Sequence, residues 1–575
     1  MRHRPSRHPD PLARERGAWR KRWAGLLPVA LLFPNRYSLG NSNLGFQLVY
    51  DLVNRLPGLV CERFFLGENT PSLSLESSRP LRDFPILLCS LSFEQDFANL
   101  IAMLRAGGIE PLAEERNPGH APSAAGRPFI LGGGVATMIN PEPLAPFIDC
   151  FLIGEAEPVL GQLMEFLASE AGRTPMRELL FELATAWPGC YVPRLYDMQY
   201  QPDGTLAAIE PQPGIPKRVR RLLLDQPPKA GHSRLLSPEM EFSDLFLAEL
   251  GRGCSRGCRF CAAGFVYRPP RLWSVESILA ALAERPGDTK RVGLLGMEMA
   301  RNEDLVRIAD LLLSEGCALS FSSLRADAIS EELCRLLAAS NLKSAAIAPD
   351  GGSERLRRVI NKGISEADVL QAAEALTQAG LTHLKLYFMI GLPTETEEDL
   401  EELLGLVDKV RQVLLAVGRG RGRLSNITLS VNSFVPKAWT PFQFHAMAGL
   451  GALKKKIQFL KRGVAGLPNT RLMVDSPGNA FLQAVLARGD RRVGLALLRL
   501  AENAAGWRQA MREAGVEPEH YAMRQRGREE VLPWEVVDHG ISRDYLWAEY
   551  GKALTGRATP ACEPLICRRC GVCHD

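Results

Sequence analysis

The sequence predicts an α/β protein with two successive parallel sheets, followed by a helical region and a cysteine-rich end. Short apolar strand-like runs alternate with helical stretches from about residue 26 to 170, and again from about 241 to 450. The length of 575 residues is too great for one hydrophobic core. We therefore expect several domains, with composition changes marking their borders. The expected segments are a basic disordered tail (1–25), a first α/β domain (26–204), a linker (205–240), a second α/β domain (241–450), a helical region (451–560) and a cysteine-rich metal-binding tail (561–575).

The first domain is predicted to contain a doubly wound, Rossmann-like sheet. Strand–helix alternation with glycine at strand ends, as in Gly132-Gly133-Gly134, favours parallel strands with a ligand crevice beyond their C-terminal ends. The predicted strands are Val29–Phe33, Ile86–Leu91, Pro128–Leu131 and Cys150–Ile153, and the helices are Phe46–Leu56 and Phe97–Ala106.

A Pro-rich segment with the basic run Lys217–Arg221 separates this domain from the second alternation and is interpreted as a linker or strap. Six strand–helix steps in the second domain predict a partial or full β/α barrel. Its strands are Phe246–Glu249, Arg291–Leu295, Ala318–Ser322, Ser344–Ala348, His383–Met389 and Thr428–Phe434. Helices are expected over Leu453–Arg462, Asn479–Arg488 and Arg492–Ala505.

Charge is concentrated at the N-terminus. Residues 1–25 carry seven Arg and Lys21 against Asp10 and Glu15, which makes +6, so the total of +4 leaves −2 for the remainder. The tail could solvate freely or touch RNA or an anionic surface. Leu26–Phe33 is too short to span a bilayer and lacks a cleavage site, so no membrane span is predicted and a cytoplasmic location is expected.

The 13 cysteines divide into six isolated ones in apolar surroundings and seven in two clusters, which in a reducing compartment favours metal over disulfides. Cys254, Cys258 and Cys261 lie in a Gly-rich loop after the first strand of the second domain. Thiolates bind iron–sulfur clusters, and three ligands leave one iron of a [4Fe–4S] cubane open. A structural zinc site is the alternative, but the next 55 residues offer no further Cys or His.

This loop resembles that of the radical S-adenosylmethionine (SAM) superfamily. The resemblance implies a [4Fe–4S] cluster that binds SAM and cleaves it reductively to a 5′-deoxyadenosyl radical. It also implies an external flavodoxin- or ferredoxin-type reductase. Met297 replaces a glycine of the family's pattern, and Asp350 stands where related sequences have Glu. By position along the barrel, the implied SAM contacts are Phe260, Gly296, Glu298, Ser322, Arg325, Asp350, Ser353, Arg355, Ile390 and Gly391.

The first domain resembles the cobalamin-binding domain that precedes the radical barrel in part of this superfamily. No histidine occurs between His8 and His120, so the early loops cannot supply an imidazole below cobalt. The alternative is a degenerate flavodoxin-like domain that only shapes the substrate cleft. The implied cobalamin contacts are Asn41, Ser90, Ser92, Gly132, Gly133, Gly134, Gly154 and Glu155.

The second cysteine cluster lies at the C-terminus and comprises Cys562, Cys567, Cys570 and Cys573. Its spacing is compatible with zinc or with a second iron–sulfur cluster, and a disordered reactive tail is the alternative.

The resemblance implies a radical SAM enzyme, with cobalamin-dependent methylation of an unactivated carbon, or a related modification, as its reaction. One alternative is a methylthiotransferase-like enzyme that modifies RNA, which the basic head and Gly418–Arg423 would suit. Another is a non-enzymatic cobalamin or redox sensor. The sequence does not indicate the substrate.

Overall fold

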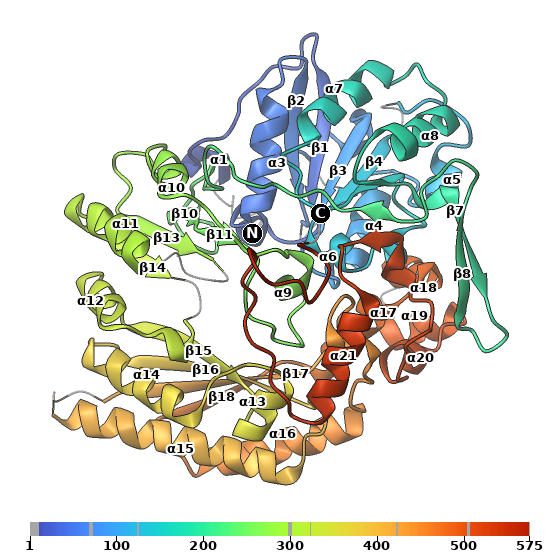
Figure 1. Cartoon of the computed structure of the whole chain (residues 1–575). Coiled ribbons are helices and arrows are strands. Elements are labelled where there is room, and N and C mark those ends of the chain that lie inside the picture. The colour runs from blue at the N-terminus through green and yellow to red at the C-terminus, as the bar shows by residue number, and fades with distance from the viewer. Residues whose placement is uncertain are drawn as a thin grey trace, which may run out of the picture.

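The computed structural model describes residues 11–67, 73–123, 126–296, 302–321, 324–420, 422, 424–502 and 506–573. Two α/β units and a C-terminal region rich in helices make up the molecule (Figure 1). The predicted α/β fold is confirmed. Within the described ranges, no helix is long and apolar enough to cross a lipid bilayer.

The first unit is built on a six-stranded sheet with the order β2-β1-β3-β4-β5-β6. All neighbours pair in parallel except β5 and β6. The order reverses at β1 and β3, and open α/β sheets bind ligands beside such a point, beyond the C-terminal strand ends. The doubly wound sheet is therefore confirmed. Its strands are β1 (Leu27–Phe33), β2 (Leu59–Phe65), β3 (Ile86–Ser90), β4 (Phe129–Gly133), β5 (Cys150–Leu152) and β6 (Cys190–Tyr191).

Tight strand–helix turns bring the C-terminal strand ends close together. Gly134, between β4 and α6, has φ of 111°, and an added Cβ would lie 2.5 Å from the carbonyl oxygen of Leu91. Only glycine fits such a turn. Asn43 caps α3 by accepting a hydrogen bond from the amide of Phe46 at 3.0 Å. The helices of this unit include α3 (Leu44–Arg55), α4 (Asp96–Ala106), α6 (Val135–Ile139), α7 (Leu160–Glu170) and α8 (Met176–Ala186).

The second unit has two parallel sheets, ordered β10-β13-β14 and β15-β16-β17-β18. A parallel bridge between Leu324 and Ile347 joins the two sheets, so the described strands form an open, partial barrel. All six predicted strands are present, and β18 adds a seventh from beyond residue 450. The strands are β10 (Phe246–Glu249), β13 (Arg291–Leu295), β14 (Ala318–Phe321), β15 (Ser344–Asp350), β16 (His383–Ile390), β17 (Asn426–Ser433) and β18 (Thr470–Val474). The helices of this unit are α10 (Val275–Leu282), α11 (Asn302–Ser314), α12 (Glu331–Ala339), α13 (Glu354–Val359), α14 (Glu366–Gln378) and α15 (Glu397–Arg419).

Residues 205–240 are an ordered strap and not a loose linker. The segment begins in a hairpin of β7 (Tyr196–Tyr200) and β8 (Leu206–Pro211). Its β9 (Val219–Arg220) then pairs with β19 (Val537–Asp538) of the C-terminal region. Leu222 bridges to Gly154 in parallel, and the strap ends beside β10. The strap therefore contacts all three parts of the molecule.

The prediction of a disordered basic tail is wrong for residues 11–25. Glu15 and Arg63 form an ion pair in which both side chains are fully buried. The backbone of Arg16 also pairs with that of Leu236 in the strap. A paired carboxylate can be buried where an unpaired one cannot, because the partner offsets the loss of hydration. Residues 1–10 lie outside the described ranges.

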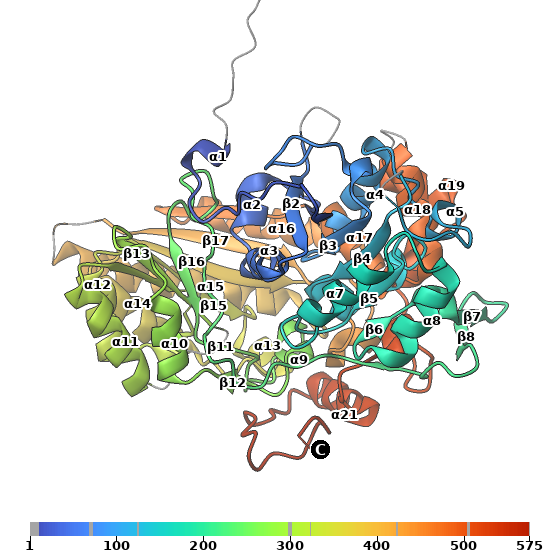
Figure 2. The ribbon, with the colours of Figure 1, turned by 90° about the horizontal axis from the view of Figure 1, so that it is seen from above.

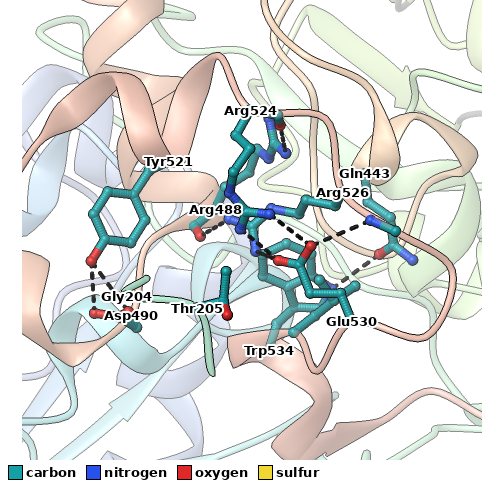
Figure 3. A network of polar contacts seen from close by, with 12 residues as sticks. Gly204, Thr205, Gln443, Arg488, Asp490, Tyr521, Arg524, Arg526, Glu530 and Trp534 are labelled. Carbon is teal, nitrogen blue, oxygen red and sulfur yellow. Dashed lines mark hydrogen bonds and ion pairs between the residues drawn. The ribbon is translucent and has the colours of Figure 1, made fainter. Parts of the chain in front are cut away.

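The C-terminal region packs its helices around a buried arginine at the end of α17 (Pro477–Arg488). Arg488 is fully buried and donates to the backbone oxygens of His445, Ala522 and Arg524. Figure 3 shows this guanidinium beside those of Arg524 and Arg526. Burial lowers the pKa of Arg526 to about 10. The other helices are α16 (Leu450–Ala465), α18 (Arg491–Glu502), α19 (Trp507–Glu513), α20 (Pro518–Ala522) and α21 (Arg543–Leu554).

Candidate active site

A cavity of about 420 Å³ lies between the C-terminal edge of the first sheet and the beginning of the second unit. The first unit contributes strand ends and the start of α3, and the second contributes β10, the loop after it, and the end of β13. From the first unit the lining includes Asn43, Ser90, Ser92, Gly132, Gly133, Gly134, Gly154, Glu155 and Glu157. From the strap and the second unit it includes His232, Glu249, Gly251, Arg252, Tyr267 and Gly296.

The wall formed by the first sheet is flat because glycines occupy it. A Cβ added at Gly133 would meet only the backbone oxygen of Leu152, at 3.7 Å, so a side chain there would extend into the cavity. At Gly132, in contrast, a Cβ would lie 2.8 Å from the ring of Phe151 on the neighbouring strand β5. The wall therefore leaves room for a broad, flat ligand at Gly133.

Asn41 does not line this cavity, unlike the other seven residues predicted to contact cobalamin. Its amide is fully buried and bonds to Glu15 and Arg63. Asn43 lies at the cavity instead and donates to the hydroxyl of Ser92 at 3.0 Å. Both asparagines follow the first strand, and the sequence does not indicate which of them lines the cavity.

His232 is the one imidazole among the described residues of the cavity wall. Its Nδ1 lies 2.7 Å from the oxygen of Ala230 and its Nε2 lies 3.1 Å from Glu284. Burial lowers the pKa of His232 to about 4, so the ring is neutral at pH 7. A neutral ring has one N–H, so only one of these two contacts can be a hydrogen bond. Nδ1 faces the Ala230 oxygen and Nε2 faces Glu284, so neither nitrogen is directed at a ligand in the cavity.

An ion-pair network connects the two units at the cavity wall. Glu155 accepts from both terminal nitrogens of Arg271, at 2.9 and 2.7 Å, and from the amide of Leu224 at 2.7 Å. Arg252 pairs with Glu157 at 2.7 Å and with Glu249 at 3.0 Å. Burial acts to raise the pKa of Glu155, but Arg271 and Arg252 hold it below its ordinary value. Glu155 thus joins the units through its carboxylate.

The three cysteines of the first cluster follow Arg252 in a loop held between β11 (Gly251–Arg252) and β12 (Arg271–Leu272), which pair antiparallel. The short helix α9 (Ala263–Val266) closes the loop and lies between the two units in both views (Figures 1 and 2). Burial raises the pKa of Cys258 and takes that of Cys261 to about 11. A metal that binds such thiols must displace their protons.

Charged side chains from the segments after β14 and β15 lie near this loop. Lys362 pairs with Asp350 at 2.5 Å, and Asp350 sits in the left-handed region with φ of 62°. Arg325 donates to the backbone oxygen of Lys362 at 3.0 Å and pairs with Asp327. Lys362, Arg325 and Asp350 all act electrostatically on Cys258. Lys362 was not predicted from the sequence, because helix α13 separates it from the end of β15.

The other residues predicted to contact SAM are placed less uniformly. Gly296 lines the cavity, and Phe260, within the cluster loop, is half-buried. Ser353 is buried, caps α13 and donates to Asp399, which also pairs with Arg355. Ile390 is buried, and a Cβ at Gly391 would meet Leu453 at 2.8 Å. Glu298 and Ser322, together with Arg421 and Arg423 of the basic run, lie outside the described residues.

The C-terminal cysteines lie against the cluster loop. The amide of Cys562 donates to the oxygen of Ser255 at 2.7 Å. Asn361 connects the backbone of Gly257 to that of Thr559. The order of this tail contrasts with the alternative of a disordered reactive end.

Within the described ranges, no three His, Cys, Asp or Glu side chains converge as ligands of one metal ion would. The thiolates of an iron–sulfur cubane bind separate irons, so they need not converge on a single point.

Two family models match the chain in the two α/β units. The model described as "Radical SAM proteins, N-terminal" matches residues 45–193, and that of the "Radical SAM superfamily" matches residues 248–407. The second match covers the cysteine loop and strands β10 to β16. The chain belongs to the radical SAM superfamily. It is therefore an enzyme, and the predicted membership of the radical SAM superfamily is confirmed.

Two further proteins resemble this radical SAM enzyme along most of its length. An uncharacterized protein of Methanocaldococcus jannaschii is 27% identical over 469 residues, which is 81% of this chain and 89% of the relative. The radical SAM methyltransferase TsrM of Kitasatospora setae, solved with cobalamin and a [4Fe–4S] cluster bound, has a similar structure. It superposes with a TM-score of 0.50 at 14% identity, covering 84% of this chain and 100% of TsrM. The fold of this chain is thus similar to that of TsrM.

Proposed function

We propose that this enzyme holds a [4Fe–4S] cluster on Cys254, Cys258 and Cys261 and binds cobalamin in the cavity between its two units. The proposed reaction is methylation of an unactivated carbon. When bound, SAM and the cluster would supply the 5′-deoxyadenosyl radical and cobalamin the methyl group. The cavity carries the proposal, because strand ends of the first sheet and the loop leading to the cysteines line the same space.

The residues of the chain fit these groups in distinct ways. The glycine wall at Gly133 offers a flat surface for a macrocycle, and it provides no imidazole to bind cobalt from below. We therefore expect cobalamin to bind base-off. TsrM, which has a similar fold, binds cobalamin and a [4Fe–4S] cluster.

The charged group beside the cysteines would orient SAM. The Lys362 ammonium and the Arg325 guanidinium are suited to a carboxylate, and the Asp350 carboxylate is suited to an ammonium or to hydroxyl groups. Gly296 lies where the cavity meets the end of β13. These residues would bind and position SAM between the cluster loop and the cavity.

The proposal includes a reducing, cytoplasmic setting and an external low-potential protein as electron donor. All 13 cysteines are free in the structure, as a reducing compartment requires. RNA remains one substrate class to test, by mass spectrometry of RNA and protein digests from cells lacking the enzyme.

The cluster assignment is tested by anaerobic reconstitution with iron and sulfide. The triple variant C254S/C258S/C261S should form no 5′-deoxyadenosine, whereas C334S, which changes an isolated cysteine of α12, should match the unaltered protein. Unchanged SAM cleavage in the triple variant would contradict the assignment.

The cobalamin assignment is tested with Gly133→Trp, which puts an indole into the cavity without a backbone clash. Gly58→Trp is the matched control, because Gly58 is exposed, has no atom near its missing Cβ and precedes β2 at the opposite edge of the sheet. We expect Gly133→Trp to lose cobalamin and the control to retain it with a base-off spectrum. Equal retention by both variants would place cobalamin elsewhere.

A further inference from the structure

The C-terminal tail has the spacing of iron–sulfur ligands. Cys562, Cys567 and Cys570 follow the pattern C-x4-C-x2-C, and Cys567, Cys570 and Cys573 follow C-x2-C-x2-C. Both patterns occur in ferredoxins. Structural zinc sites, in contrast, usually separate two close pairs of ligands by a longer segment. The spacing therefore favours a cluster over a zinc ion.

Two of the four cysteines of the tail are buried, and Cys567 and Cys573 are half-buried. Cys562 and Cys570 are buried, with exposed fractions of 8% and 4%, whereas Leu565 and Ile566 between them are exposed to 90% and 72%. An apolar core would bury the leucine and isoleucine instead. The thiols of Cys562 and Cys567 contact each other, and Cys562, Cys567 and Cys570 line one small cavity. Sulfur atoms of the tail therefore line this small cavity.

The same cavity is closed by the loop of the first cysteine cluster. Ser255 and Gly257 line it from that loop, and Ser255 accepts the hydrogen bond of the Cys562 amide at 2.7 Å. Arg268 stacks on Phe265, with its guanidinium carbon 4.4 Å from the ring centre, and it lines the cavity together with Cys570. The site therefore shares its wall with the catalytic loop.

Two arginines supply positive charge at this cavity. Arg569 donates to the sulfur of Cys567 at 3.3 Å and to the oxygen of Ala561 at 2.7 Å. Together with Arg268 it can offset the negative charge that four thiolates bring to a cluster.

We propose that Cys562, Cys567, Cys570 and Cys573 hold an auxiliary iron–sulfur cluster, docked against the loop that carries Cys254, Cys258 and Cys261. The site adds to the proposed function, and it does not require cobalamin. Arg268 and Ser255 connect the two loops, so metal in the tail stabilises the position of the catalytic loop.

The test uses the full chain, reconstituted with iron and sulfide without oxygen. The C254S/C258S/C261S variant leaves the tail unaltered and should retain about half of the bound iron, roughly four atoms per chain for a four-iron cluster. The variant C567S/C570S should lose a similar amount and still cleave SAM. The control C334S should keep the full iron content and both electron paramagnetic resonance signals of the reduced protein.

The outcomes separate the two sites. If C254S/C258S/C261S binds no iron while the unaltered protein does, the auxiliary cluster is refuted and the catalytic cluster stands. If that variant instead holds zinc and lacks iron–sulfur absorbance, the auxiliary cluster is likewise refuted. If it loses no iron at all, the catalytic assignment fails and the tail site stands. Because the tail docks on the altered loop, an unchanged thermal midpoint of C254S/C258S/C261S relative to C334S is the check that the tail still folds.

Discussion

Replacing Glu155 by glutamine should weaken the contact between the two α/β units. The Glu155 side chain is 3% exposed, and it receives two hydrogen bonds from Arg271, whose own side chain is 6% exposed. Glutamine keeps the size but removes the charge, which leaves Arg271 buried without its counter-ion. Loss of one partner from a buried pair costs about 3–5 kcal/mol. Arg252 also loses its 3.6 Å contact with Glu155 but keeps Glu157 and Glu249, so Arg271 loses most.

Urea unfolding followed by tryptophan fluorescence measures this effect. Trp273 reports on the site directly, because the guanidinium carbons of Arg252 and Arg271 lie 5.8 and 5.9 Å from its ring centre. The unfolding free energy of the first transition is compared between the variant and the unaltered protein, because a multidomain chain need not unfold in one step. Glu366→Gln is the control, because it breaks an exposed pair with Lys409 and should cost at most about 1 kcal/mol. A Glu155→Gln variant within about 1 kcal/mol of the unaltered protein would refute a role of this pair in joining the units.

Three further outcomes are expected. Lys362→Met should leave the iron content unchanged and reduce SAM affinity about tenfold or more, because it removes the partner of the buried Asp350 carboxylate; equilibrium binding of SAM measures this. Burial lowers the pKa of His539 to about 3, whereas in the unfolded chain it is about 6.5. Below pH 6.5 the unfolded chain therefore takes up a proton that the folded chain does not, and the unfolding free energy decreases as the pH falls toward 3. His539→Gln should therefore flatten the fall in unfolding free energy below pH 6.5 by up to about 1.4 kcal/mol per pH unit, as shown by unfolding curves at several pH values. Arg488→Met should lower the unfolding free energy by about 2–4 kcal/mol, because it removes the donor to three buried carbonyls, and an unchanged thermal midpoint would contradict this.

The strands of the second unit could be predicted closely because their apolar runs are short and bounded by polar turns. The first unit was harder, and β2 was missed. Its sequence, Leu59–Phe65, contains Glu62 and Arg63 within the apolar run, and both are buried in the fold. Glu62 accepts from the Trp23 indole, and Arg63 pairs with Glu15. Both partners come from the N-terminal segment, far from β2 in sequence, so no local sequence pattern predicts that these charged residues are buried.

The candidate site shows the same division between local and long-range information. Strand-end glycines and the cysteine loop are local signals, and they could be read directly from the sequence. The side-chain partners of Asn41, Ser353 and Glu155 come from elsewhere in the chain, so their engagement could not be predicted. Lys362 was missed for the same reason, since only the fold brings it beside Asp350.

The strap explains how two units that are distant in sequence come to line one cavity. Leu222 donates to the oxygen of Ile153 at 2.8 Å, directly at the strand end that carries Gly154 and Glu155. A Cβ at Gly154 would lie 2.3 Å from the Leu222 backbone, so glycine is required there by the strap as well as by any ligand. Farther along, Gly231 accepts from the amide of Glu249 at the end of β10. The strap is therefore hydrogen-bonded to the first sheet and to the strand before the cysteine loop, and it fixes the separation across which the two proposed cofactors would act.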